Sequence, residues 1–82
     1  MSIGSNEVVL IRETLLRSSA PDKVLFDAAE RKYGAVLKNG LMIVVVCDGV
    51  GDNADVEVNG STIGTYHRVY DIIKVILDIR SI

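Results

Sequence analysis

The chain has 82 residues, of which 49% are hydrophobic and 24% are charged, and its net charge is −2 at neutral pH. This composition predicts a small globular protein and argues against disorder. With one cysteine and one histidine, the chain lacks the residues for an internal disulfide or a Cys/His zinc site, which need paired cysteines or about four ligands. We therefore expect a single α+β domain over residues 1–82, with residues 1–5 flexible and with no cofactor.

The longest uninterrupted apolar run, Leu41 to Cys47, is too short to cross a membrane. Residues 1–7 lack the basic start and the apolar core of a signal peptide. A lone thiol suits a reducing compartment. The sequence therefore predicts a cytoplasmic protein without a membrane partner.

A first helix is expected over residues 6–17. Val8, Ile11 and Leu15 recur at helical spacing, and Ser5 is placed to cap the helix. The apolar run that begins at Val8 would also suit the start of a strand, so this alternative stays open.

A second helix is expected between Ser19 and Gly34. Ser19 and Asp22 resemble a capping box, and Gly34 stands where a left-handed helix stop is expected. The apolar positions that form the predicted stripe are Leu25, Ala28, Ala29 and Tyr33.

Two Asn-Gly pairs, at residues 39–40 and 59–60, lie between strand-like runs. Asn-Gly in this position favours a type I′ hairpin, because both central residues need a positive φ. The two pairs predict two hairpins and four strands, which we place at residues 35–38, 41–47, 55–58 and 61–65.

A last helix is expected over residues 66–80, because its apolar positions recur at intervals of three and four. These positions are Val69, Ile72, Ile73, Ile76 and Ile79. The predicted order is therefore α-α-β-β-β-β-α, with a four-stranded antiparallel sheet packed by helices.

The strand at residues 41–47 is apolar on both of its faces. Such a strand is normally covered on both sides. Either the helices cover both faces, or the second face packs against another subunit, and we expect a homodimer or an unidentified protein partner. The second face is predicted to carry Leu37, Met42, Val44 and Val46, and these residues form the predicted interaction surface.

A polar cluster stands at the expected start of the last helix, where free backbone N–H groups favour an anion. The candidate anion-binding residues are Thr65, Tyr66, His67, Arg68 and Tyr70, with Thr65 as the cap and the tyrosines as stacking surfaces. An ion pair between Arg68 and Glu57 would explain the cluster without any ligand.

An acidic stretch at residues 48–57 carries four acids and no base. Asp48, Asp52 and Asp55 are a weak candidate for a metal site, since hard cations prefer oxygen ligands. A solvated hairpin loop is the preferred explanation, and no metal is expected. Cys47 is expected to be buried and His67 has no catalytic companion, so we expect no enzyme.

These observations favour a small non-enzymatic interaction, regulatory or inhibitor module that uses an apolar sheet face or an edge strand. The alternative is the binding of an anion, a nucleotide or a nucleic acid at the start of the last helix. The mild net negative charge gives nucleic acid no support.

Overall fold

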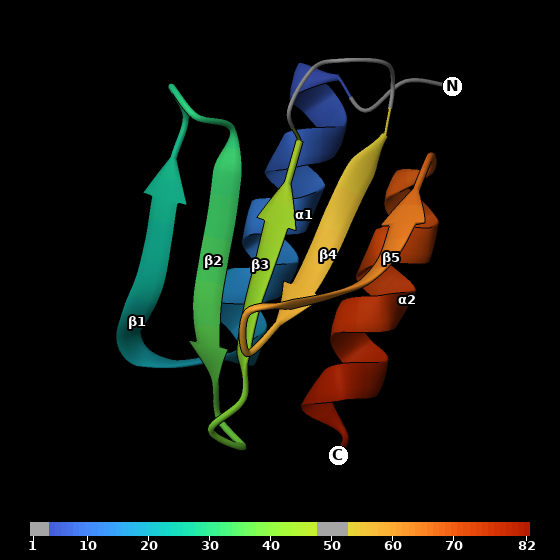
Figure 1. The fold of residues 1–82 in the computed structure, drawn as a ribbon. Coiled ribbons are helices and arrows are strands. Elements are labelled where there is room, and N and C mark those ends of the chain that lie inside the picture. Colours follow the sequence, from blue (N-terminus) through green and yellow to red (C-terminus); the bar gives the residue numbers. More distant parts are fainter. Residues whose placement is uncertain (1–3, 48–52) are drawn as a thin grey trace.

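A computed structural model describes residues 4–47 and 53–82 of the chain. These residues form two helices and five strands, and the strands make one antiparallel sheet in the order β1-β2-β3-β4-β5 (Figure 1). The expectation of an α+β domain with an antiparallel sheet is confirmed, but the sheet has five strands, not four. The elements are α1 (Ser5–Ser18), β1 (Ser19–Asp27), β2 (Lys32–Leu37), β3 (Met42–Val46), β4 (Ala54–Val58), β5 (Ser61–Tyr66) and α2 (Val69–Arg80).

The predicted second helix is wrong, because its residues form the β1–β2 hairpin. Phe26 pairs with Tyr33 across the two strands, and their rings meet edge to face with centroids 6.0 Å apart. Such aromatic cross-strand pairs stabilise a sheet. The connecting loop closes through a hydrogen bond from the backbone N–H of Glu30 to Oδ1 of Asp27, and Arg31 adopts a positive φ of 54°.

The two helices that periodicity predicted are present with shifted boundaries. Helix α1 starts at Ser5, with Gly4 rather than Ser5 in the N-cap position. Helix α2 starts at Val69 and not at residue 66, because β5 continues through Tyr66.

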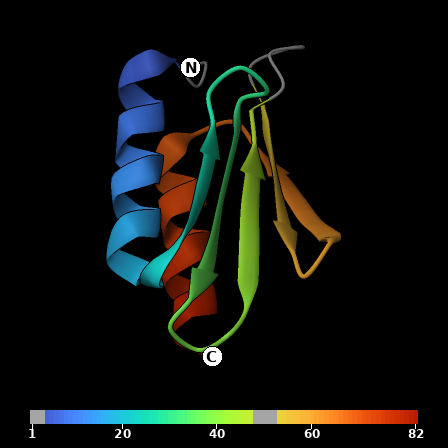
Figure 2. The ribbon, with the colours of Figure 1, turned by 90° about the vertical axis from the view of Figure 1, so that its left-hand side faces the viewer.

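Both helices lie on one side of the sheet and run in the same direction (Figures 1 and 2). The helices pack on each other and on this side of the sheet. The core between the two layers includes the buried Val8, Ile11, Leu15, Tyr33, Ala35, Leu37, Ile43, Val45, Cys47, Ala54, Val56, Val69, Ile72, Ile76 and Ile79. The fold is thus two-layered, and the far side of the sheet carries neither described helix.

The two Asn-Gly turns differ from each other. Val58 pairs directly with Ser61, and Asn59 and Gly60 have φ values of 49° and 87°, as a type I′ turn requires. In the other turn Val36 pairs with Met42, so the strands are separated by a longer loop in which Gly40 has a positive φ of 90°.

Candidate interaction surface

The side of the sheet that faces away from the helices, called the open face below, carries Met42, Val44 and Val46. Their neighbours Ile43 and Val45 are fully buried under the helices, whereas Met42 is 43% exposed and the two valines are half-buried. Side chains alternate between the faces of a strand, so β3 contributes apolar side chains to both faces of the sheet.

Leu37 does not join these residues: it is 1% exposed and belongs to the helix-covered core. The expected two-residue turn would pair Leu37 with Met42, but the longer loop pairs Val36 with Met42. A slip of one residue moves every side chain of a strand to the other face. Val36 therefore takes the place on the open face that was predicted for Leu37.

The open face holds a contiguous group of apolar side chains, called the apolar patch below. Its members are Leu25, Val36, Met42, Val44 and Val46. Leu25 is the most exposed of them at 77%. Sequence reasoning missed Leu25 because it placed that residue on a helix. The three consecutive apolar residues from Val24 to Phe26, a run that also suits a strand with apolar side chains on both faces, were the signal that could have found it.

A shallow hollow of about 250 Å³ opens in the apolar patch around Gly34. Gly34 lies between Leu25 on β1 and Val44 on β3. A Cβ at Gly34 would meet Cγ2 of Val44 at 3.4 Å, so the missing side chain leaves room above the sheet. The rim of the hollow includes Lys23, whose chain position two residues before Leu25 places it on the same face.

Charged residues flank the apolar patch on both sides. Lys32 on β2 pairs with Val46 on β3, and Val46 pairs with Asp55 on β4. In the next row, Val44 pairs with Glu57. The open face is therefore basic on β2 and acidic on β4, with apolar β3 between them, and in the first row Asp27 on β1 lies beside Lys32.

The carboxylate of Asp55 is held in place by a neighbouring strand. The hydroxyl of Thr65 donates a hydrogen bond of 2.6 Å to Oδ1 of Asp55. Hydrogen bonds to a carboxylate are shorter and stronger than those between neutral groups. Thr65 therefore orients an acid on the open face. The sequence predicted that Thr65 caps α2, but the residue in the N-cap position is Arg68.

Both sheet edges are irregular, which makes them poor templates for a partner strand. Strand β1 contains Pro21, and its pairing with β2 shifts between Ser19 and Val24. Strand β5 carries an extra residue, Ile63, where the register shifts opposite Val56 and Glu57. The sheet face is the better candidate surface.

The predicted anion-binding residues are spread over the end of β5, the connection that follows it and the start of α2. Tyr66 ends β5 with its side chain half-buried, and Tyr70 is 75% exposed on α2. Arg68 is the N-cap of α2, and among the described residues no side chain caps this helix start. His67 is exposed in the connection between β5 and α2.

The predicted metal candidates Asp48 and Asp52 lie outside the described residues. Within residues 4–47 and 53–82, no group of three His, Cys, Asp or Glu side chains is placed to hold a metal ion. Cys47 is buried at the end of β3.

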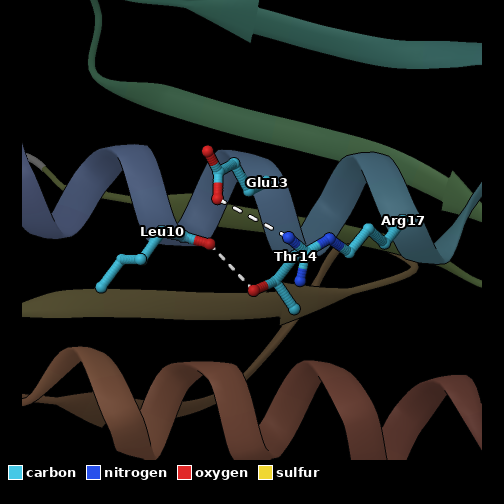
Figure 3. A network of polar contacts seen from close by, with 4 residues as sticks. All are labelled: Leu10, Glu13, Thr14 and Arg17. Carbon is cyan, nitrogen blue, oxygen red and sulfur yellow. Dashed lines mark hydrogen bonds and ion pairs between the residues drawn. The ribbon is translucent and has the colours of Figure 1, made fainter.

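The outer surface of the helix layer has ordinary local contacts. On α1 the Arg17 guanidinium lies 3.9 Å from the Glu13 carboxylate, and the Thr14 hydroxyl donates to the carbonyl of Leu10 at 2.8 Å (Figure 3). Exposed pairs of this kind contribute little to stability.

A second hollow, of about 190 Å³, lies between the last turns of α1 and α2 and is bordered by Arg17 and Arg80. Ser18 at its base is fully buried, and its hydroxyl has no hydrogen-bond partner in the described structure. Cations are favoured at the C-terminal ends of helices. The two arginines are therefore explained by the helices that carry them.

Comparison of the chain with protein-family models, with curated proteins and with solved structures found no match in any of the three. Neither of the two described helices has the length and apolar character needed to span a membrane.

Proposed function

We propose that the protein is a non-enzymatic interaction module that packs its open face against another protein, and that it associates with itself through this face. The observation that carries the proposal is the apolar patch on the side of the sheet away from both described helices. A contiguous exposed apolar patch typically marks a contact surface. Antiparallel sheets with one wet side normally place polar residues there, whereas the centre of this face carries Val44 and Val46.

The energy available at the patch suits a reversible contact. Complete burial of a Leu, Val or Met side chain contributes about 1.5–3 kcal/mol. Three of the five patch residues are already half-buried in the monomer. The free energy gained when they are buried on association is therefore only a fraction of the value for complete burial of all five side chains. Association itself costs at least about 4 kcal/mol in lost freedom of motion. We therefore expect a modest affinity rather than a permanent assembly.

The proposal is tested by a pair of lysine substitutions. Val44→Lys places a charge at the centre of the open face, and its side chain can extend into solvent in the monomer. Leu16→Lys is the matched control, because Leu16 is 52% exposed on α1 in the other layer. The readout is molar mass by sedimentation velocity from about 1 µM to about 500 µM, a range that spans weak contacts, with circular dichroism to verify folding.

We expect the natural chain and Leu16→Lys to dimerise alike, and Val44→Lys to remain a folded monomer. A natural chain that is monomeric throughout, or association that survives Val44→Lys, would overturn the proposal. Association lost in Leu16→Lys alone would move the contact to the helix layer.

Anion binding at the start of α2 has less support than self-association. Thr65, the proposed cap, is bonded to Asp55 in the sheet, and Tyr66 belongs to β5. The cytoplasm is the proposed compartment, since the one cysteine is buried and needs no disulfide partner.

A further inference from the structure

The charge pattern of the open face restricts how two copies can meet, and the following inference rests on the proposed self-association. Strand β3 is the middle strand of the sheet, with β2 on one side and β4 on the other. Lys32 and Asp55 stand in one row on either side of Val46. Gly34 and Glu57 stand in the next row on either side of Val44.

Two stacked sheets related by a two-fold axis, as in most dimers, have two simple arrangements. We consider aligned packing, in which two sheets keep their strand directions within about 30° of each other. The axis can therefore run along the strands or across them. These arrangements bring different side chains together.

An axis along β3 places β2 of each copy over β4 of the other copy. Each row of residues then faces the same row of the partner subunit. Lys32 then faces Asp55 of the partner subunit, and the contact occurs twice by symmetry. Gly34 then faces Glu57 of the partner subunit. The hollow at Gly34 provides space for that longer acid, and Lys23 on its rim provides an opposite charge.

An axis across the strands places β4 of one copy over β4 of the other copy. It also reverses the order of the rows, so that the first row of one copy lies over the last row of the other. With the axis through the central row, Glu57 faces Glu57 of the partner subunit. Like charges placed together at an interface cost several kcal/mol. This arrangement also leaves Lys32 without an acid opposite.

We propose that two copies of the chain pack open face to open face about a two-fold axis parallel to β3, with Lys32 paired to Asp55 of the partner subunit on both sides. Met42, Val44 and Val46 lie along the axis and meet their own counterparts. The hydrogen bond from Thr65 holds the Asp55 carboxylate for this contact.

The size of the sheet makes the charge pairs important. Five strands at about 4.8 Å spacing and five residues at about 3.4 Å give a face of about 400 Å² per copy. Two such faces total about 800 Å², below the 1,200 Å² or so at which standard stable interfaces begin. With so little area, two ion pairs contribute a large part of the selectivity for this arrangement.

The decisive experiment mixes two charge-reversal variants, Lys32→Glu and Asp55→Lys. Alone, each variant places like charges opposite each other at both symmetric contacts, and we expect dimerisation at least tenfold weaker, equivalent to about 1.4 kcal/mol. A mixture restores opposite charges at both contacts of the heterodimer. We therefore expect the mixture to dimerise with an affinity near that of the natural chain, measured by sedimentation velocity with one variant fluorescently labelled.

Two outcomes would overturn the arrangement: single variants that dimerise normally, or a mixture that stays monomeric. If Val44→Lys still abolishes association in either case, the proposed function stands and only the arrangement is wrong. Glu57→Gln separates the two axes, because it should strengthen a dimer whose axis runs across the strands and leave the proposed one unchanged or weaker.

Asp55→Lys removes the bond to Thr65, so a second test avoids that substitution should the variant unfold. In the chain that carries Lys32→Glu and Asp55→Asn together, the amide no longer repels Glu at position 32. We expect this double variant to dimerise more tightly than Lys32→Glu alone. Equal affinities of the two would overturn the pairing.

Discussion

The side-chain amide of Asn39 donates a hydrogen bond of 2.8 Å to the carbonyl oxygen of Ile79, and thereby ties the turn between β2 and β3 to the last turn of α2. The same amide reaches the carbonyl of Arg80 at 3.2 Å. Its own oxygen accepts from the backbone N–H of Leu41 at 3.1 Å. The last carbonyls of a helix lack partners within the helix, so Asn39 acts as the C-terminal cap of α2 from a distant part of the chain.

We predict that Asn39→Ala lowers the free energy of unfolding by about 1 kcal/mol, the net value of a hydrogen bond. Asn39→Asp should lower it further, because the carboxylate faces carbonyl oxygens and the negative end of the α2 dipole. Urea unfolding followed by circular dichroism measures both, with Lys38→Ala in the same turn as the control. Equal stability of Asn39→Asp and the natural chain would contradict the capping role.

Local signals in the sequence predicted the elements whose contacts are local. The stripe of Val8, Ile11 and Leu15 predicted α1, and its counterpart from Val69 to Ile79 predicted α2. These residues are buried in the core, except Ile73, which is partly buried and packs against it. The capping contact of Asn39 joins residues forty positions apart, so no pattern near Asn39 indicates it.

The second predicted helix failed because a non-local pairing outweighed a weak helical pattern. Ala28 and Ala29 completed the expected stripe, but both are exposed in the loop between β1 and β2. Strand preferences depend on the neighbours across the sheet. For Phe26 that neighbour is Tyr33. This pairing could not be predicted before β1 and β2 were known to be neighbouring strands.

The candidate surface was predicted in part for the same reason. Met42, Val44 and Val46 follow from the alternation of one strand. Leu37 was placed on the wrong face because the Asn39-Gly40 turn is one residue longer than its sequence suggested. The hollow at Gly34 and the position of Leu25 depend on β1, which the sequence reading had assigned to a helix.

Gly64 and Tyr66 form a close approach that the strand pattern does not reveal. A Cβ at Gly64 would lie 2.7 Å from the Tyr66 hydroxyl and 2.9 Å from its ring carbon Cζ. Tyr66 packs against the core, so Gly64→Ala forces the ring to move. Because the atoms in contact are the far end of a half-buried side chain, we expect a loss of about 1 kcal/mol, the low end of the cost of overpacking.

A double-mutant cycle with Tyr66→Leu tests this close approach. Once the ring is removed, Gly64→Ala should cost much less or become favourable, because alanine loses less conformational freedom than glycine on folding. Both steps are measured by urea unfolding. The same cost in both backgrounds would show that the tyrosine ring is not the obstacle.

Two neighbouring residues of α2 should respond very differently to truncation. Ile76 is fully buried between the layers, whereas Leu77, the next residue, is 37% exposed. Truncating a buried isoleucine to alanine costs about 2–5 kcal/mol, because transfer energy is lost and a cavity remains. A domain has a total stability of about 5–15 kcal/mol, so Ile76→Ala should remove a large part of it.

Leu77→Ala is the matched control, since it truncates a residue of the same size on the same helix. It should cost less than Ile76→Ala, because Leu77 is already 37% exposed and less burial is lost. Ile76→Val should also cost less than Ile76→Ala, at about 0.5–1.5 kcal/mol. Urea unfolding at a protein concentration where the chain is monomeric keeps self-association out of the measurement. Similar losses for Ile76→Ala and Leu77→Ala would mean that α2 does not pack against the sheet through its isoleucine stripe.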